Sequence, residues 1–155
     1  MIRYVLAALL TVALVGVSMG VISYGAGVSS ERQVSSDVIQ LDRAAQSILA
    51  DEDLPPNAEN GPQRVVTIRF PADSPTATPL DTFEVQRVNE SLTTVTYRID
   101  GRTTRTHVID APIVSADQHE RERLMLSGTD EAMRLLLTLE RDETGDRVVK
   151  LSQID

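Results

Sequence analysis

A short group of ionisable side chains lies in the segment SADQHERE, residues 115–122. Asp117, His119, Glu120 and Glu122 are of the types that ligate metal ions. A single histidine with no second ligand at a defined spacing is more typical of a charged loop. We therefore predict no metal site here.

Two other polar features could in principle carry chemistry. The segment RDETGD, residues 141–146, gathers carboxylates but lacks the full calcium-loop pattern, which favours a solvated hairpin tip. His107 as a general base would need a nucleophile and an orienting acid, and the expected strand register places it opposite Thr94 with neither. We expect no catalytic residue, no cofactor and no enzymatic activity.

A possible modification site is Asn89, which begins the N-glycosylation sequon Asn-Glu-Ser in a predicted turn. With three asparagines in the chain the match can arise by chance. A location outside the cell would make the site usable.

The charge composition restricts the class of partner. One lysine, Lys150, stands against fourteen arginines and twenty-three acidic residues, and the net charge is -8. An acidic surface repels nucleic acid, so a nucleic-acid partner is not expected. A lysine-poor, acidic chain without cysteine resembles halophilic archaeal proteins; an ordinary acidic protein from a GC-rich organism is the alternative.

The N-terminal stretch is apolar. No charged residue occurs from Tyr4 to Ser30, a run of 27 residues, and about 20 suffice to span a membrane. Arg3 supplies a positive flank, which favours the N-terminus inside and the C-terminal domain outside. A cleaved signal peptide, with cleavage at 16–18 or 25–27, is the competing interpretation.

Small residues recur within this run. Gly16 and Gly20 form a G-x-x-x-G pair, and Ser23 and Gly27 repeat the spacing, which allows helices to approach closely in lipid. Such residues are also common near signal-peptide ends. The spacing makes Gly16 and Gly20 a candidate helix-packing site, and a signal-peptide end is the alternative explanation of these small residues.

An amphipathic helix is predicted for residues 31–53. Apolar residues recur there at alternating steps of four and three, and a proline pair at 55–56 prevents continuation. This apolar seam packs either against another subunit or against the protein's own sheet. Its members are Val34, Val38, Leu41, Ala45 and Ile48.

Beyond a linker at 54–63 the apolar period changes to two, which predicts strands. Val66, Ile68 and Phe70 share one face of the first run, and Phe83 and Val85 share a face of the second.

Two hairpins are predicted. Asp100-Gly101 is a type I′ turn dipeptide, and a two-residue loop would pair Tyr97 with Thr104. It would also pair Val95 with Thr106.

The last hairpin has a five-residue loop, 142–146, which sets Leu139 against Val149 and Leu137 against Leu151. A helix over 129–141 is the alternative.

The segments MIRYVLAALLTVAL, LDRAAQSILADEDLPP and RVVTIRF resemble small haloarchaeal proteins of type IV pilus assembly loci, and the layout resembles type IV pilins and pseudopilins. Tyr4 follows Arg3 where archaeal prepilins usually have Gly or Ala, and the apolar run contains no acid. The resemblance therefore implies an accessory or pseudopilin-like protein with partners in such an assembly.

Together these features predict an α+β fold, with a long N-terminal helix followed by an antiparallel sheet of four to six strands. The expected parts are an anchor at 1–30, an amphipathic helix at 31–53, a linker at 54–63 and a β domain at 64–155. The expected function is a non-enzymatic, membrane-anchored structural subunit. The alternative is a secreted or anchored ligand-binding β domain released after signal cleavage.

Overall fold

The computed structural model describes residues 2–54, 61–116, 123–126 and 132–154. Within α1 the side-chain surroundings are described for residues 4–15 and from residue 24 onward. One helix precedes all the strands in these ranges. The elements are α1 (Ile2–Asp51), β1 (Gln63–Arg69), β2 (Leu80–Arg87), β3 (Thr93–Ile99), β4 (Arg105–Ile109), β5 (Ile113–Ser115), β6 (Arg123–Leu126), β7 (Ala132–Arg141) and β8 (Arg147–Ile154).

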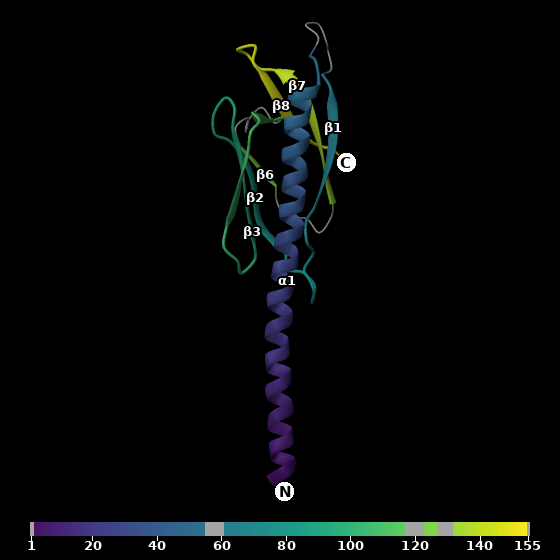
Figure 1. Cartoon of the computed structure of the whole chain (residues 1–155), viewed down its shortest axis with the longest axis vertical. Helices are drawn as coiled ribbons and strands as arrows, with labels where there is room; N and C mark the ends of the chain where they lie inside the picture. The colour runs from purple at the N-terminus through teal and green to yellow at the C-terminus, as the bar shows by residue number, and fades with distance from the viewer. Residues whose placement is uncertain (1, 55–60, 117–122, 127–131, 155) are drawn as a thin grey trace.

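The helix α1 runs without a break for 50 residues, a length of roughly 75 Å. Its N-terminal part extends beyond the sheets, and its C-terminal part lies among them (Figure 1). No proline occurs within it, and it ends shortly before the proline pair at 55–56. Just past its end, the carbonyl of Glu52 accepts a hydrogen bond of 2.6 Å from Nη2 of Arg147, which ties this end of the helix to β8.

The strands form two four-stranded sheets, in the orders β1-β7-β8-β5 and β4-β3-β2-β6. Neighbours pair antiparallel, except that β5 pairs parallel with β8. The α+β class is therefore confirmed, whereas the single antiparallel sheet of four to six strands is wrong. Alternating polarity identifies a strand and its buried face, but it does not say which sheet the strand joins.

The C-terminal half of α1 closes one side of the two-sheet structure. It contacts the edge strand β1 of one sheet and strands β3 and β4 of the other (Figure 1). The apolar seam, Val34 to Ile48, is at most 1 % exposed and shares one core with residues of both sheets. The seam therefore packs against the protein's own sheets, the second of the two alternatives.

The strand faces agree with the alternating pattern. Val66, Ile68 and Phe70 are buried, as are Phe83 and Val85. The Phe70 and Phe83 rings meet edge to face, with centroids 5.9 Å apart. Because Phe70 directly follows β1 and Phe83 lies in β2, this contact joins the two sheets through the core.

The β7–β8 hairpin has the predicted register. Leu139 pairs with Val149 and Leu137 with Leu151, which confirms the five-residue loop. Residues 132–141 form β7, so the helical alternative is wrong over that range, and residues 129–131 lie outside the described part of the chain.

The β3–β4 hairpin differs from the prediction by one residue. Tyr97 pairs with Arg105 and Val95 with His107, rather than with Thr104 and Thr106. Gly101 has the predicted positive φ, 66°, but no non-glycine residue in the described chain has one. A type I′ turn needs positive φ at both central positions, so the turn is of another type. The shift brings His107 to the face that carries Val95, towards the helix.

Candidate functional site

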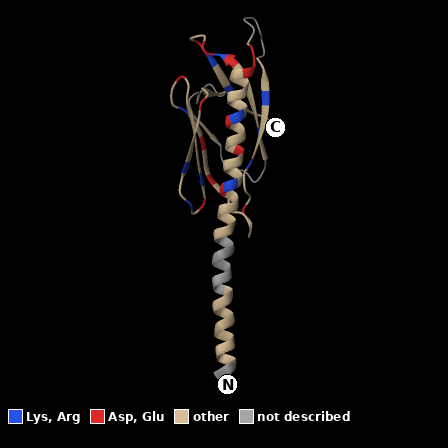
Figure 2. Cartoon of the chain, in the orientation of Figure 1, with Lys and Arg blue, Asp and Glu red and all other residues tan. Residues whose placement is uncertain are grey.

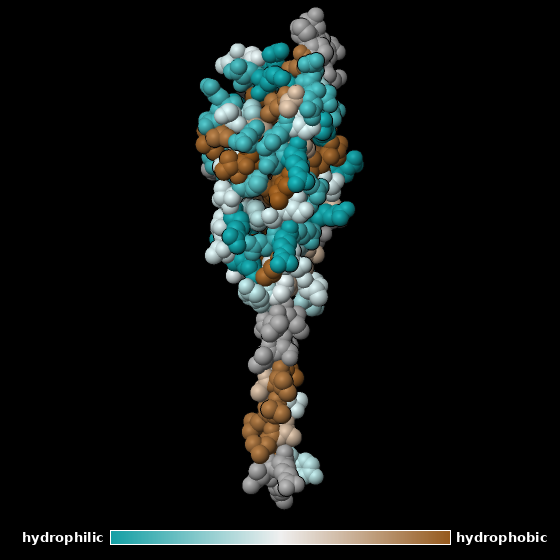
Figure 3. Space-filling view, in the orientation of Figure 1, coloured by the Kyte–Doolittle hydropathy of each residue, from teal (hydrophilic) through white to brown (hydrophobic). Residues whose placement is uncertain are grey.

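The exposed apolar part of α1 is the most unusual surface of the molecule. Tyr4, Leu9, Leu10 and Val12 are 61–83 % exposed. In Figure 3 this stretch is a bare, largely hydrophobic rod below the mostly hydrophilic sheet region. Over the side chains that the structure describes, no helical stretch has both the length and the apolar character needed to cross a membrane.

Charged side chains surround α1 at the point where it leaves the sheets. Glu31 accepts hydrogen bonds from Nη1 of Arg102 at 3.0 Å and from Nε of Arg105 at 2.5 Å. The Arg102 guanidinium also lies over the Tyr24 ring, 5.0 Å from its centroid, a cation–π geometry. The β3–β4 turn is thereby fastened across the helix.

Gly27 makes this crossing possible. A Cβ atom at position 27 would lie 2.6 Å from Nε of Arg102. A larger residue would displace the guanidinium from the helix surface. Gly27 was predicted as part of a helix–helix packing spacing, but here its small size accommodates an arginine of the same chain.

On the other side, α1 covers the free edge of β1. Oδ2 of Asp37 accepts a hydrogen bond from the backbone N–H of Arg69 at 2.9 Å, and Nε2 of Gln33 donates to the carbonyl of the same residue at 3.1 Å. Burial raises the pKa of Asp37, while the hydrogen bond and the positive charge of Arg69 act in the opposite direction. Helix side chains thus satisfy backbone groups that an edge strand would otherwise present to other chains.

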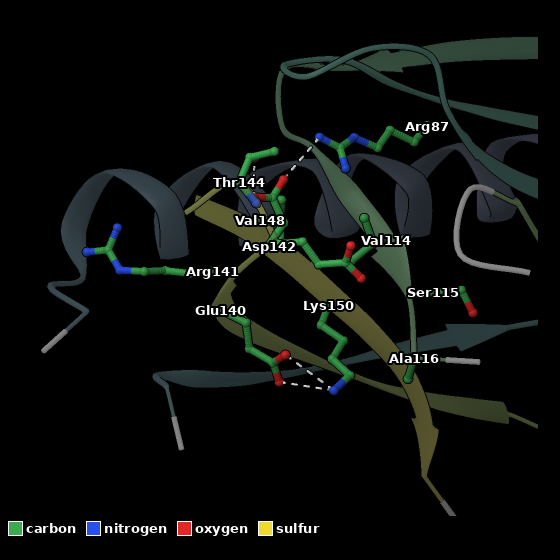
Figure 4. Close-up of a pocket in the computed structure, with 11 residues that line it drawn as sticks. Arg87, Val114, Ser115, Ala116, Glu140, Arg141, Asp142, Thr144, Val148 and Lys150 are labelled. Carbon is green, nitrogen blue, oxygen red and sulfur yellow. Dashed lines mark hydrogen bonds and ion pairs between the residues drawn. The ribbon is translucent and has the colours of Figure 1, made fainter. Parts of the chain in front are cut away.

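A cavity of about 390 Å³ lies beside β5 and the β7–β8 turn (Figure 4). Four of its charged groups form two pairs: Arg87 lies 3.8 Å from Asp142, and Lys150 lies 3.2 Å from Glu140. Arg141 points away from these pairs (Figure 4) and donates to the carbonyl of Gly145. Such pairing suits a corner stabilised by ion pairs rather than a site for a charged ligand.

The carboxylate of Asp142 has a local structural role. Its Oδ1 accepts hydrogen bonds from the backbone N–H groups of Thr144 and Asp146, both at 3.0 Å. The hydrogen bonds, foremost that from the Thr144 side chain, lower the pKa of Asp142. The segment 141–146 is thus a turn closed by its own acid, as the hairpin-tip interpretation expects.

The remaining polar candidates are His107 and the ionisable residues at 117–122. His107 contacts the helix, with Nε2 3.1 Å from Oδ2 of Asp42. Asp117, His119, Glu120 and Glu122 lie outside the described residues. Among the residues that are described, no group of three or more His, Asp or Glu could hold a metal ion.

Asn89 is exposed in the turn between β2 and β3. Its Oδ1 accepts hydrogen bonds from the backbone N–H groups of Ser91 and Leu92, at 2.9 and 2.8 Å. These contacts use the side-chain oxygen and not the amide nitrogen, the atom that glycosylation modifies. The sequon is therefore accessible.

Two predicted packing residues, Gly16 and Gly20, belong to α1, but their surroundings lie outside the described residues. Sequence reasoning did not single out Glu31, Asp37 or Arg102, which fasten the helix to the sheets. The start of charge directly after the uncharged run marks Glu31 in the sequence, whereas no local signal marks Asp37 or Arg102.

The fold and these contacts define an α+β protein in which a long helix closes two sheets and continues beyond them as an apolar rod. The chain belongs to the family described as Domain of unknown function (DUF7311), whose model matches residues 1–154. No curated protein and no solved structure gives a significant match to the chain.

Proposed function

We propose that this protein is a non-enzymatic, membrane-anchored structural or interaction subunit, with its sheets outside the cell. One observation carries the proposal: a single helix joins an exposed apolar segment to a segment buried in the core. Water does not favour an apolar rod exposed on all sides, so lipid or other helices must cover it.

The sequence supplies a sufficient length for an anchor. The uncharged run of 27 residues, at 1.5 Å per residue, is longer than the roughly 30 Å of a bilayer's hydrocarbon core. The first charged residue after it is Glu31, which the two arginines of the β3–β4 hairpin bind. The uncharged run therefore ends where the helix enters the sheets.

Contacts near the possible cleavage site favour retention of the segment. Ala26 is 7 % exposed, and Oγ of Ser30 accepts a hydrogen bond from the backbone N–H of Thr78 at 2.9 Å. Cleavage after residue 27 would remove Ala26 and the Arg102 contact with Tyr24. A signal peptide normally makes no such contacts with the mature domain, so they argue against cleavage at 25–27. Cleavage at 16–18 would keep these contacts, and the mass of the mature chain distinguishes it from retention.

Within this class, the layout and the resemblance favour an accessory or pseudopilin-like component of an archaeal pilus-like assembly. The seam already packs against the chain's own sheets. Partners would therefore contact the projecting part of α1 or the outer surfaces. Gly16 and Gly20 have the spacing that lets helices approach closely in lipid.

This proposal can be tested by affinity purification from cross-linked membranes of the native host. We expect the full chain to retain membrane partners that themselves carry an N-terminal apolar helix. Gly16→Leu with Gly20→Leu should reduce their recovery, whereas Val17→Leu, on another face of the helix, should not. Recovery that is identical for both variants and wild type would contradict a packing role for the glycine pair, and absence of any membrane partner would contradict the assembly role.

A further inference from the structure

A groove of about 740 Å³ runs beside α1 at the end of the sheets nearest the projecting rod. Four of its charged lining residues are arginines, against one glutamate, in a chain whose net charge is -8. Figure 2 marks both basic and acidic residues on the C-terminal half of α1 and on the strands, and none on the described part of the projecting rod. The charged residues of this basic groove are Arg32, Arg43, Arg102, Arg105 and Glu31.

The arginines of the groove retain capacity to bind an anion. Arg102 and Arg105 share the single carboxylate of Glu31, which leaves one surplus positive charge. Arg32 is exposed and has no ion pair among the described residues. The Arg105 side chain is 56 % exposed, and its bond to Glu31 uses Nε, which leaves its Nη groups as further donors.

Nearby acids do not cancel this charge. Asp81 is bound by Arg98, and Asp100 does not line the groove, although it lines a neighbouring pocket together with Tyr24 and Arg102. The surplus positive charge therefore lies on the residues that line the groove.

The position of the groove identifies the kind of anion. Arg102 lies over Tyr24, which is 70 % exposed and belongs to the uncharged run. Tyrosine is enriched at the membrane–water interface, where its ring lies at headgroup level. An arginine that stacks on such a ring lies at the same depth, and guanidinium groups match phosphate through paired N–H donors.

We propose that Arg32, Arg102 and Arg105 bind the phosphate of an anionic lipid headgroup. This inference rests on the membrane anchoring proposed above. The lipid would contact the protein on the side of α1 next to the β3–β4 hairpin, and it would fix both the depth of the helix and the rotation of the sheets about it.

The test uses the full chain in a neutral detergent, with thermal unfolding followed during titration with dihexanoylphosphatidylglycerol. We expect a saturable rise in the unfolding midpoint, because a ligand that binds only the folded state stabilises it. Dihexanoylphosphatidylcholine and inorganic phosphate, at the same concentrations, should give much smaller shifts. An equal shift with the choline lipid or with phosphate would overturn the assignment to an anionic lipid.

The matched variants are Arg32→Gln with Arg105→Gln, and Arg64→Gln as control. Arg64 also pairs with a glutamate, Glu52 at 3.4 Å, but just past the C-terminal end of α1 and away from the groove. The double variant should weaken the apparent affinity by about tenfold, and the control should not. Unchanged affinity in the double variant, or an equal loss in the control, would overturn the proposal.

Membrane retention of the same variants separates the two proposals. The double variant should remain in the membrane fraction as wild type does, because the apolar run is intact. If wild type is retained but shows no lipid preference, the lipid inference alone fails; if wild type is not retained, the anchoring proposal fails as well.

Discussion

Asp37 of α1 accepts a hydrogen bond from the backbone N–H of Arg69 in the edge strand β1, with Oδ2 and N 2.9 Å apart. The helix thus covers a strand edge with a buried carboxylate rather than with an apolar side chain. The N–H of the last residue of β1 is therefore paired within the chain and is not free to bind a strand of another chain. This hydrogen bond joins α1 directly to the backbone of β1.

The pH dependence of stability should show the burial of Asp37. Burial raises its pKa above the ordinary value of 3.8, so the folded state retains this proton to higher pH than the unfolded state does. The relevant pH range lies between the pKa of Asp37 in the unfolded chain and its higher pKa in the folded chain. Within this range, lowering the pH increases the contribution of Asp37 to the free energy of unfolding. Asp37→Asn keeps an oxygen acceptor and cannot titrate. Its thermal midpoint at pH 7 should equal or exceed that of wild type and should gain less on acidification.

The control for this change is Asp37→Ala, which removes the acceptor and leaves the Arg69 N–H without it. It should lower the midpoint at every pH, because a buried donor is then unsatisfied. If Asp37→Asn is as destabilised as Asp37→Ala, the carboxylate charge is needed and our account of its pKa is wrong.

The packing of the seam can be measured at Leu41, which is fully buried between the sheets. Leu41→Ala should reduce the free energy of unfolding by about 2–5 kcal/mol, through lost burial and a residual cavity. Ile39, two residues away and 37 % exposed, is the matched control. Ile39→Ala should cost less than about 1 kcal/mol. Denaturant unfolding that shows similar losses for both would contradict a seam packed inside the chain.

The β3–β4 turn depends on the backbone of Gly101. Its φ is 66°, and a Cβ at this position would meet no atom within 4 Å, so a substitution tests conformation alone. Gly101→Val should destabilise the protein by about 1–3 kcal/mol, whereas Gly101→Asn should cost less because asparagine tolerates positive φ. Thermal melts that rank the two variants in the reverse order would refute this explanation.

The two hairpins show how far the sequence determines strand register. In β7 and β8 the leucines and valines can face one another in only one register, since a shift by one would set Leu137 against Lys150. In β4 the residues before Val108 are mostly threonine and arginine, which do not distinguish a buried face. The predicted register of that hairpin therefore depended on the assumed two-residue turn. Thr103 and Thr104 lie outside the strand, and the observed register is displaced by one residue.

The long-range contacts of α1 were beyond sequence reasoning for a different reason. The spacing of Val34 to Ile48 identifies a buried face, but two sheets of one chain and a second subunit would bury it equally well. Likewise, the charges of Glu31, Arg102 and Arg105 are visible in the sequence, yet their meeting depends on the packing of the β3–β4 hairpin against the helix. Local periodicity carries no information about such distant partners.

Alkaline carbonate extraction, followed by intact mass measurement of the natively produced protein, tests the anchoring most directly. We expect a full-length species of 17.0 kDa that stays in the membrane pellet, because 27 uncharged residues resist transfer into water. Leu9→Arg with Leu10→Arg should release it, whereas Val65→Arg, on the exposed face of β1, should not. A soluble wild-type species that begins near Met19 or Val28 would contradict retention of the N-terminal helix as a membrane anchor.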